Sequence, residues 1–246
     1  MRCSREDPAL VTVIDLHTHT EVGSSDSRTT PADIAAIRSR IPSLHGITLT
    51  EHVRRWPDEV MEQAPPDLSL FNEREFDTPQ GHVLVLGAPA VTRAANVAQL
   101  RERVLEAGGL MILAHPFRFY PSPLSLLYPR EWHEPGEWPP ERLAEHPLFD
   151  LVDAVEAWTY RATREQNELA ARCARIRDLP IVAGSDSHAP EDVGRFATEF
   201  ADTVESVEAL IAAIRSGRGV PVELTSAGSY VPLEQPVRAP SLRALE

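Results

Sequence analysis

Two histidines at the end of an apolar stretch are the first residues whose types and spacing suggest chemistry. The segment 11–19 reads VTVIDLHTH, and the β-branched residues at its start favour a strand. Side chains alternate between the faces of a strand, so His17 and His19 point the same way, roughly 7 Å apart along the backbone. Two imidazoles in this arrangement can bind one metal ion, although two solvent-facing histidines in a loop would show the same pattern.

Further metal-binding side chains recur where other predicted strands end or begin. Together with the first pair, the residues that offer nitrogen or oxygen donors at such positions, or in the adjoining loops, are His17, His19, Asp26, His52, Glu75, His82, His115, Asp186 and His188. Any one of them alone would more often be a structural or solvent-facing residue. Packing has no use for ionisable groups at the ends of buried strands, so their accumulation there predicts a metal site.

Short apolar strands alternate with amphipathic helices along the chain, which is the pattern of a parallel sheet covered by helices. We predict strands at 11–19, 46–50, 68–77, 81–87, 110–114, 151–158, 180–184, 197–200 and 220–224, and helices at 30–40, 92–107, 164–177 and 206–215. The strand at 68–77 is irregular and its register is open. About seven strand–helix units suit a closed or nearly closed barrel, whose parallel strands would bring the donors to one face. An open doubly wound sheet is the alternative.

Two stretches depart from this alternation. The segment 117–147 is rich in proline and aromatic residues, and a loop of this length directly after His115 is typical of a functional or mobile element. From residue 226 the chain is rich in proline, serine and arginine, which predicts a loosely ordered tail. We therefore expect one domain over 1–225 and a tail over 226–246.

The composition limits the classes of function. The 246 residues carry 24 basic and 37 acidic side chains, a net charge of −13 that would repel a nucleic-acid backbone. All basic residues are arginines, so Schiff-base chemistry and a lysine general base are excluded. Cys3 and Cys173 form no thiolate zinc motif. The first residues lack the apolar core of a signal peptide, and no apolar run is long enough to span a membrane, so we expect a cytoplasmic protein.

The donor-bearing segments together resemble the PHP family, named for polymerase and histidinol phosphatase, over about residues 11–225. The matching segments are DLHTHT with Ser25-Asp26, LTEH, Glu75 followed by GHVLVLG, AHP, and GSDSH. The resemblance implies an α/β fold, a distorted (β/α)7 TIM-like barrel, with two or three divalent transition-metal ions. Imidazole and carboxylate ligands suit Zn, Mn or Fe, and the sequence does not choose among them.

The resemblance also implies how the donors are shared among the metals. One metal would be held by His17, His19, Glu75 and Asp186, a second by Glu75, His82 and His115, and a third by Asp26, His52 and His188. The other histidines, His45, His133 and His146, have no counterpart.

Two departures from the family pattern bear on this assignment. The family reaches its bridging glutamate through a Gly-x-Glu turn, whereas the segment here reads Glu73-Arg74-Glu75. Glu73 is therefore a rival, and we prefer Glu75 for its spacing to the GHVLVLG strand. The large helical insertion that some nucleotide-acting members carry after AHP is absent, and the segment 117–147 stands in its place.

A centre of this kind predicts hydrolysis of a phosphate ester by a hydroxide that bridges the metals. Besides the ligands Glu75 and Asp186, the best candidate for a catalytic residue is Arg118, which would offset charge on the phosphoryl oxygens. Arg161 and Arg195 are further candidates for substrate binding, and a surface ion pair is the alternative for each arginine. Glu156 could orient a ligand histidine or form a buried ion pair.

Four functions compete at this point. The first is a phosphoesterase, foremost a phosphomonoesterase, that acts on a small phosphorylated metabolite or nucleotide. The second is a metal-dependent hydrolase of C–N or C–O bonds, because the same hydroxide attacks carbonyl groups. The third is a nucleic-acid-processing domain, which the net charge disfavours. The fourth is a domain that uses metal only for folding, which the completeness of the donor set disfavours. The oligomeric state is left open.

Overall fold

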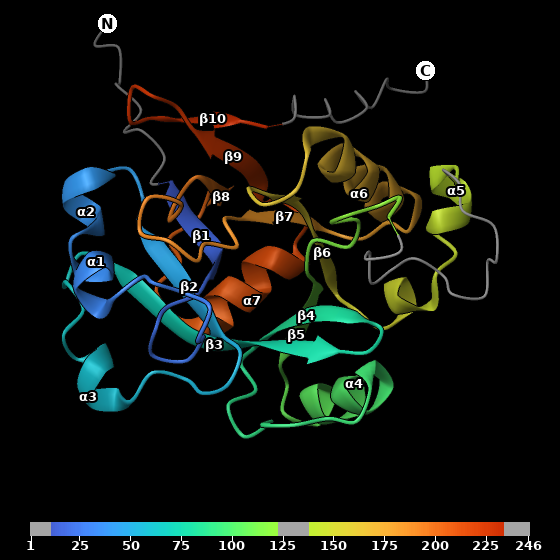
Figure 1. Ribbon diagram of the computed structural model, residues 1–246, viewed down its shortest axis with the longest axis horizontal. Coiled ribbons are helices and arrows are strands. Elements are labelled where there is room, and N and C mark those ends of the chain that lie inside the picture. Colours follow the sequence, from blue (N-terminus) through green and yellow to red (C-terminus); the bar gives the residue numbers. More distant parts are fainter. Residues whose placement is uncertain (1–10, 123–137, 234–246) are drawn as a thin grey trace, which may run out of the picture.

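One curled sheet of ten strands forms the frame of the molecule (Figure 1). The computed structural model describes residues 11–122 and 138–233, to which the structural statements below refer. The strands are β1 (Thr12–Thr18), β2 (Gly46–Glu51), β3 (Ser69–Thr78), β4 (Gly81–Leu86), β5 (Leu110–Leu113), β6 (Ala154–Thr159), β7 (Ile181–Gly184), β8 (Phe196–Phe200), β9 (Val220–Leu224) and β10 (Tyr230–Pro232). Their order in the sheet is β10-β9-β8-β1-β2-β3-β4-β5-β6-β7.

The sheet nearly closes on itself between β7 and β1. Ser187, just beyond β7, pairs in parallel with Thr18 at the end of β1. The His19 N–H donates to the Ser187 carbonyl at 3.0 Å, and the Ser187 N–H donates to the His17 carbonyl at 3.4 Å. The architecture is therefore the distorted TIM-like barrel that the sequence predicts, and its closure brings the HTH segment against the SDSH segment.

Strand β4 runs against the expected parallel arrangement. β1, β2 and β3 are parallel to one another, as are β5, β6 and β7, whereas β4 is antiparallel to both of its neighbours. The connection from Thr78 to Gly81 is too short for the crossover that a parallel pair needs. Because β4 is reversed, its first residues lie at the face where the parallel strands end, which brings His82 to that face. β3, which looks irregular in the sequence, is a continuous strand of 10 residues.

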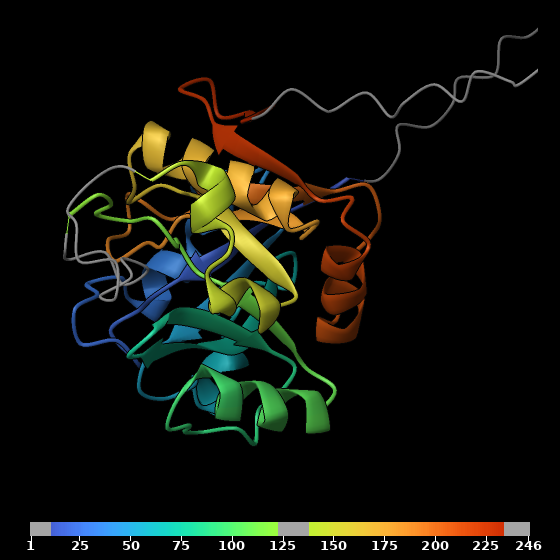
Figure 2. The same ribbon diagram turned by 90° about the vertical axis from the view of Figure 1, so that its right-hand side faces the viewer.

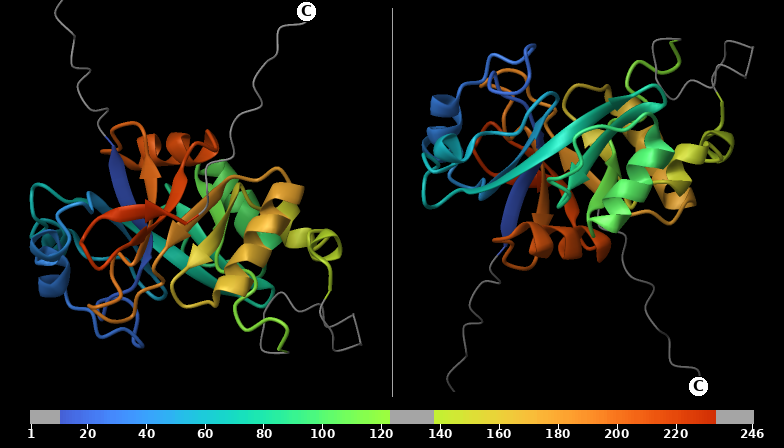
Figure 3. Two further views of the ribbon diagram at one scale, coloured as in Figure 1. Left: turned by 90° about the horizontal axis from the view of Figure 1, so that it is seen from above. Right: turned by 90° about the horizontal axis from the view of Figure 1, so that it is seen from below.

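Helices cover the outer faces of the sheet and one end of the barrel (Figures 1 and 2). They are α1 (Pro31–Ala35), α2 (Ile37–Arg40), α3 (Asp58–Met61), α4 (Val97–Glu106), α5 (Pro140–Leu143), α6 (Arg164–Ile176) and α7 (Val207–Arg215), with a 3₁₀ turn at Pro147–Asp150. Seen from above and below, α6 lies alongside β6 and β7 (Figure 3). α7 lies on the side of the barrel away from the loops after β1 and β5 (Figure 2).

The barrel interior is apolar towards α7. Ile14, Leu16, Leu84 and Ile112 are fully buried there against the apolar side chains of α7. Two further apolar clusters lie between the outer strand faces and the covering helices. These layers hold the strands rigidly, so the polar residues at the strand ends are presented by a fixed frame.

Four segments differ from the sequence prediction. The helix predicted over 92–107 begins at Val97, where the Asn96 side chain caps it by accepting a hydrogen bond from the Gln99 N–H, and the strand predicted over 151–158 begins at Ala154. The helix predicted over 30–40 is interrupted at Ala36, between α1 and α2, although Thr30 caps its start by accepting a hydrogen bond from the Asp33 N–H. The tail predicted from residue 226 is not loosely ordered throughout, because β10 pairs antiparallel with β9. The centre of the segment 117–147 and the tail beyond 233 lie outside the described residues. No helix in the described parts of the chain is long and apolar enough to cross a membrane.

Candidate metal centre

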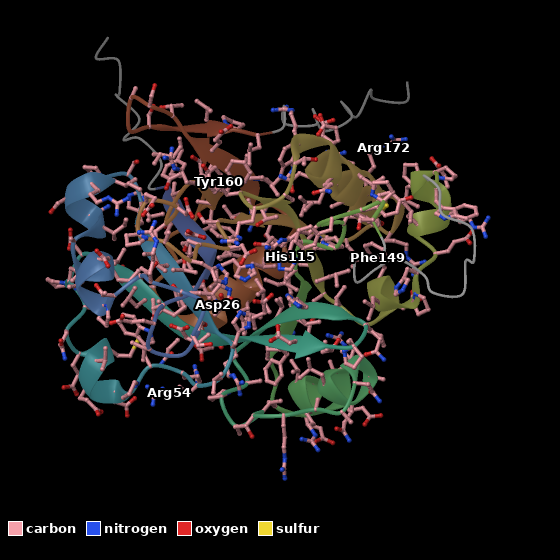
Figure 4. The ribbon with its side chains drawn as sticks, viewed as in Figure 1. Asp26, Arg54, His115, Phe149, Tyr160 and Arg172 are labelled. Carbon is pink, nitrogen blue, oxygen red and sulfur yellow. The ribbon has the colours of Figure 1, made fainter. Side chains whose placement is uncertain are left out.

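The nine predicted donors lie in one continuous cluster at the end of the barrel opposite α7. Each of them contacts at least one other member of the set. Figure 4 shows two members, Asp26 and His115, near the middle of the molecule although they come from loops that are distant in the sequence. The topology therefore gathers the donors as predicted, whereas their role as metal ligands stays a prediction.

Four donor atoms converge at the centre of the cluster. His17 Nε2 lies 2.9 Å from His19 Nε2, and both nitrogens lie 3.2 Å from Glu75 Oε2. The same nitrogens lie 3.6 and 3.5 Å from Asp186 Oδ1. Ligand atoms around a tetrahedral Zn²⁺ are about 3.4 Å apart, since each lies about 2.0–2.2 Å from the metal. The spacing of these four donors therefore fits one metal ion.

The hydrogen bond on the far side of the His17 ring fixes where its proton lies. His17 Nδ1 lies 3.0 Å from Glu156 Oε1, so the neutral ring donates through Nδ1 and turns its Nε2 lone pair towards the cluster. The Glu156 carboxylate also accepts the His115 N–H at 3.1 Å. Lone pairs and carboxylate oxygens then face one another in a buried site, which is stable only with protons or a cation between them.

Glu75 directs its other oxygen at a second group of donors. Glu75 Oε1 lies 3.1 Å from His82 Nδ1 and 3.3 Å from His115 Nε2. Glu75 Oε1 and His115 Nε2 are buried and make no hydrogen bond to any described residue. Buried polar atoms of a folded protein are rarely left unpaired, so these two fit a cation between them. Glu75 thus reaches both groups, as a bridging carboxylate would.

The third group is more exposed and includes a residue that the sequence analysis missed. His188 Nε2 lies 3.1 Å from Asp26 Oδ2, and the His52 ring stacks on His19 at 4.4 Å between centroids. Asp77 Oδ1 lies 3.3 Å from His52 Nδ1 and 3.5 Å from His82 Nε2. Asp77 follows Glu75 by two positions on β3, so the two-residue period of a strand could have identified it.

Local backbone conformation aims two of the donors. His115 and Asp186, which follow β5 and β7, have φ angles of 31° and 49°, in the left-handed region that only glycine adopts readily. Such conformations cost about 1–3 kcal/mol each and are concentrated at functional sites. At Gly184 a Cβ would lie 2.6 Å from His17 Cβ and 2.7 Å from Glu156 Oε1, so only glycine lets β7 approach this closely.

The charges in the cluster shift its proton equilibria strongly. Burial would lower the pKa of His19, but contacts with Asp186 and Glu75 outweigh it and raise the pKa to about 9. The pKa of His17 is raised well above its usual value, since Glu156, Glu75 and Asp186 outweigh burial. Burial would raise the pKa values of Glu75 and Asp186, but the surrounding histidines hold both below their usual range. Without a metal, protons on the histidines therefore balance the carboxylates.

Metal uptake should release these protons. The pKa values of His17 and His19 are raised, so protons that these rings hold at pH 7 in the metal-free protein must leave when a cation binds. We expect Zn²⁺ addition to release at least one proton per chain at pH 7, and apparent metal affinity to rise with pH through about 9. A pH-stat titration would measure the release. His45→Gln, outside the cluster, should leave it unchanged; a titration without proton release would contradict the ligand assignment.

The three candidate arginines differ in their distance from the cluster. An Arg118 terminal nitrogen lies 3.0 Å from Asp186 Oδ2, and Arg161 Nε lies 3.9 Å from the same oxygen. Arg195 instead lies over the Tyr160 ring, 5.7 Å from its centroid, and donates to the Glu191 carbonyl. Arg118 and Arg161 thus border the donors, whereas substrate binding by Arg195 has no contact of this kind to support it.

Glu73, the rival of Glu75, occupies a different environment. It accepts the Gly87 N–H at 2.9 Å and lies 3.6 Å from an Arg55 nitrogen. Burial raises its pKa to about 7 despite these two contacts. No described histidine forms an ion pair or hydrogen bond with it, so the geometry favours Glu75 as the central carboxylate.

Comparisons with known proteins concern the fold and one segment of the sequence. Residues 164–218, which span α6 to α7 and include Asp186 and His188, match the family model PHP_C, described as PHP-associated. No curated protein matches the sequence.

Several solved structures share the fold. A two-domain protein from Bacteroides vulgatus, described as containing a predicted PHP-like metal-dependent phosphoesterase, superposes with a TM-score of 0.60 at 19% identity, over 87% of this chain and 65% of its own. The lesion-specific endonuclease EndoQ from Pyrococcus furiosus gives 0.55 at 16%, over 84% and 56%. An amidohydrolase from Chromobacterium violaceum, solved with bound sulfate and no metal, gives 0.54 at 16%, over 88% and 99%.

These identities establish the fold alone, and the chain spans less than two thirds of the first two proteins. The match over 164–218 is a similarity of sequence rather than of fold, and it includes two of the clustered donors. Taken together, the barrel and this match support the resemblance to the PHP family that the donor-bearing segments indicate.

Proposed function

We propose that this chain is a metal-dependent phosphoesterase that removes phosphate from a small phosphorylated metabolite or nucleotide. The observation that carries the proposal is the pair of guanidinium groups, Arg118 and Arg161, on Asp186 Oδ2 at the edge of the donor cluster. An anionic substrate is the natural partner of positive charge next to metal ligands. The structural neighbour from Bacteroides vulgatus, described as containing a predicted PHP-like metal-dependent phosphoesterase, supports the reaction class.

The nine donors would hold two or three Zn, Mn or Fe ions, with Glu75 shared between two of them. When bound, such ions lower the pKa of a water molecule and polarise a phosphoryl oxygen. The protein's own part is to position these groups. Glu156 holds the His17 ring, β7 and Gly184 hold Glu156, and Arg118 would bind an oxygen of the phosphoryl group. We further propose that a single domain carries all of these residues.

Metal content is the first quantity to measure. Because nine donors converge in three groups, we expect two or three transition-metal ions per chain in protein produced with metal supplied. Inductively coupled plasma mass spectrometry would count them. Fewer than about one ion per chain after supplementation would contradict a shared centre.

A screen of substrates tests the proposed reaction. Protein loaded with Mn²⁺, Zn²⁺ or Fe²⁺ would be incubated with phosphorylated metabolites and nucleotides, and released phosphate would be measured. The competing substrates are amides, which the amidohydrolase among the structural neighbours suggests, lactones, and an oligonucleotide that carries a lesion, which the lesion-specific endonuclease suggests. Metal-dependent phosphate release from small esters supports the proposal. Turnover confined to amides, lactones or the oligonucleotide would overturn it.

The net charge favours a small substrate over a nucleic acid. With 24 basic against 37 acidic side chains, the chain lacks the excess of positive charge that a nucleic-acid backbone requires. Arg118 and Arg161 supply positive charge only beside Asp186, which suits one phosphate group better than an extended backbone.

A further inference from the structure

A buried carboxylate lies on the Nδ1 side of the His19 ring, and one residue, Ser24, connects it to that ring. Glu51 at the end of β2 is fully buried and contacts no predicted metal ligand through its side chain. Its oxygens accept hydrogen bonds from the Thr20 N–H at 3.2 Å, the Trp56 Nε1–H at 2.9 Å and the Ser24 hydroxyl at 2.6 Å. The Thr20 hydroxyl also donates to it. Every one of these groups donates, so Glu51 acts only as an acceptor.

Ser24 connects this carboxylate to the His19 ring. Its Oγ lies 3.1 Å from His19 Nδ1 and also accepts the His52 N–H at 3.2 Å. A hydroxyl has one proton to donate, and Ser24 donates it to Glu51. Towards His19 the hydroxyl can therefore only accept, which requires the proton of the His19 ring to lie on Nδ1. In the neutral ring, the form that binds a metal, the Nε2 lone pair is then directed at Glu75 and Asp186.

The loop is shaped to hold this contact. At Gly23 a Cβ would lie 2.1 Å from the Arg54 carbonyl oxygen and 2.6 Å from Glu51 Cβ. No other residue fits there without moving the backbone, so Gly23 lets the loop press Ser24 against Glu51. Ser24 is 1% exposed, which removes water as a competing partner for its hydroxyl.

We propose that Glu51 and Ser24 are positioning residues that keep the proton of the neutral His19 ring on Nδ1. They do so through a chain of hydrogen bonds in which the imidazole donates to the hydroxyl and the hydroxyl donates to the carboxylate. The proposal rests on the metal centre of the proposed function and extends it to two residues outside the donor set. Glu156 orients His17 by direct contact, whereas Glu51 orients His19 through Ser24. Both strand histidines thus present Nε2 to the same point.

The variant Glu51→Gln tests the direction of the chain. The amide oxygen of the new side chain would occupy the Oε1 position, where the Trp56 and Thr20 donors converge, and its NH₂ would face Ser24. The Ser24 hydroxyl would then be free to donate to His19 Nδ1, which favours a proton on Nε2, where the metal should bind. We expect the apparent Zn²⁺ affinity of the tightest site to fall about 10- to 100-fold, as for other residues that orient a ligand. Ser24→Ala should weaken it in the same range.

Ser27→Ala is the matched control. Ser27 is a second buried serine of the same loop, and its hydroxyl donates to the His19 carbonyl at 2.9 Å rather than to the ring. Zn²⁺ affinity would be measured by competition with a chelating dye, and the fold by circular dichroism and Tm without metal. The ¹⁵N-labelled Zn²⁺ protein should lose the hydrogen-bonded Nδ1–H signal of His19 in Ser24→Ala and keep it in Ser27→Ala.

Each outcome decides the proposal. Affinity lost in Ser24→Ala and Glu51→Gln, but kept in Ser27→Ala at similar Tm, supports it. Equal Zn²⁺ affinities in all three variants would show that Glu51 and Ser24 only stabilise the loop, and would overturn it. If Glu51→Gln does not fold, Ser24→Cys, similar in size but a weak acceptor, should show the same loss. These readouts need no substrate, so a failed phosphate-release screen leaves them intact.

Discussion

Replacing Glu75 by glutamine should abolish phosphate-ester hydrolysis and remove at least one bound metal. Glu75 is the one described carboxylate that contacts five clustered histidines, with one oxygen towards His17 and His19 and the other towards His82 and His115. Glutamine keeps the shape but loses the charge and one acceptor. Since bound metals stabilise the transition state by several kcal/mol, we expect kcat to fall at least about 10³-fold. Steady-state kinetics and mass-spectrometric metal counts on the same sample would measure both effects.

Glu73→Gln is the control for this variant, because the two glutamates lie on the same strand and are both buried. We expect kcat and metal content to change little. The pKa of Glu73 is raised to about 7, so ionising it destabilises the folded state increasingly as the pH rises from about 4.5 through 7. Glutamine removes this cost, and the Tm of the variant should gain more at pH 8 than at pH 5. Reversed effects of the two variants would show that Glu73 is the bridging residue.

The sequence predicts the donor cluster well because the relevant signals are local. A strand can be recognised from a few β-branched residues, and a histidine or acid at its end needs no further information. For this reason the positions of His17, His115, Asp186 and His188 follow from short segments, and the barrel follows from the alternation of strands and helices.

Other parts of the site depend on contacts between distant segments. The short connection between β3 and β4 indicates that these two strands are antiparallel, but nothing within 68–86 shows that β4 also runs against β5. The reversal of β4 brings His82 to the donors. Asp77 shares a face of β3 with Glu75, but its place between His52 and His82 follows only from the pairing of β3 and β4. Ser24 and Glu51 look like ordinary loop and strand-end residues until the fold places them behind His19.

Replacing Arg118 by glutamine should separate phosphate chemistry from hydrolysis of a neutral substrate. The guanidinium lies 3.0 Å from Asp186 Oδ2, and its Nε is buried without a hydrogen-bond partner among the described residues, so it retains capacity to bind an anion. Loss of one such donor typically lowers kcat about 10²- to 10³-fold. We expect a fall of about 10²-fold with phosphate esters, together with weaker inhibition by inorganic phosphate and unchanged metal content. Arg118→Lys should recover part of the activity, because it keeps the charge but loses the planar fork.

Arg172→Gln on α6 is the matched control, since it removes the same charge from an exposed position at the edge of the molecule, away from His115 (Figure 4). Kinetics with a phosphate ester should then differ between the two variants by about two orders of magnitude. A neutral amide or lactone has no negative charge for Arg118 to bind. If such a compound were the natural substrate, Arg118→Gln would change its turnover as little as Arg172→Gln does. A phosphate-ester activity equally insensitive to both substitutions would remove Arg118 from the site, and with it the observation on which the phosphoesterase proposal depends. Because metal content is measured on the same samples, such a result would leave the metal centre itself standing.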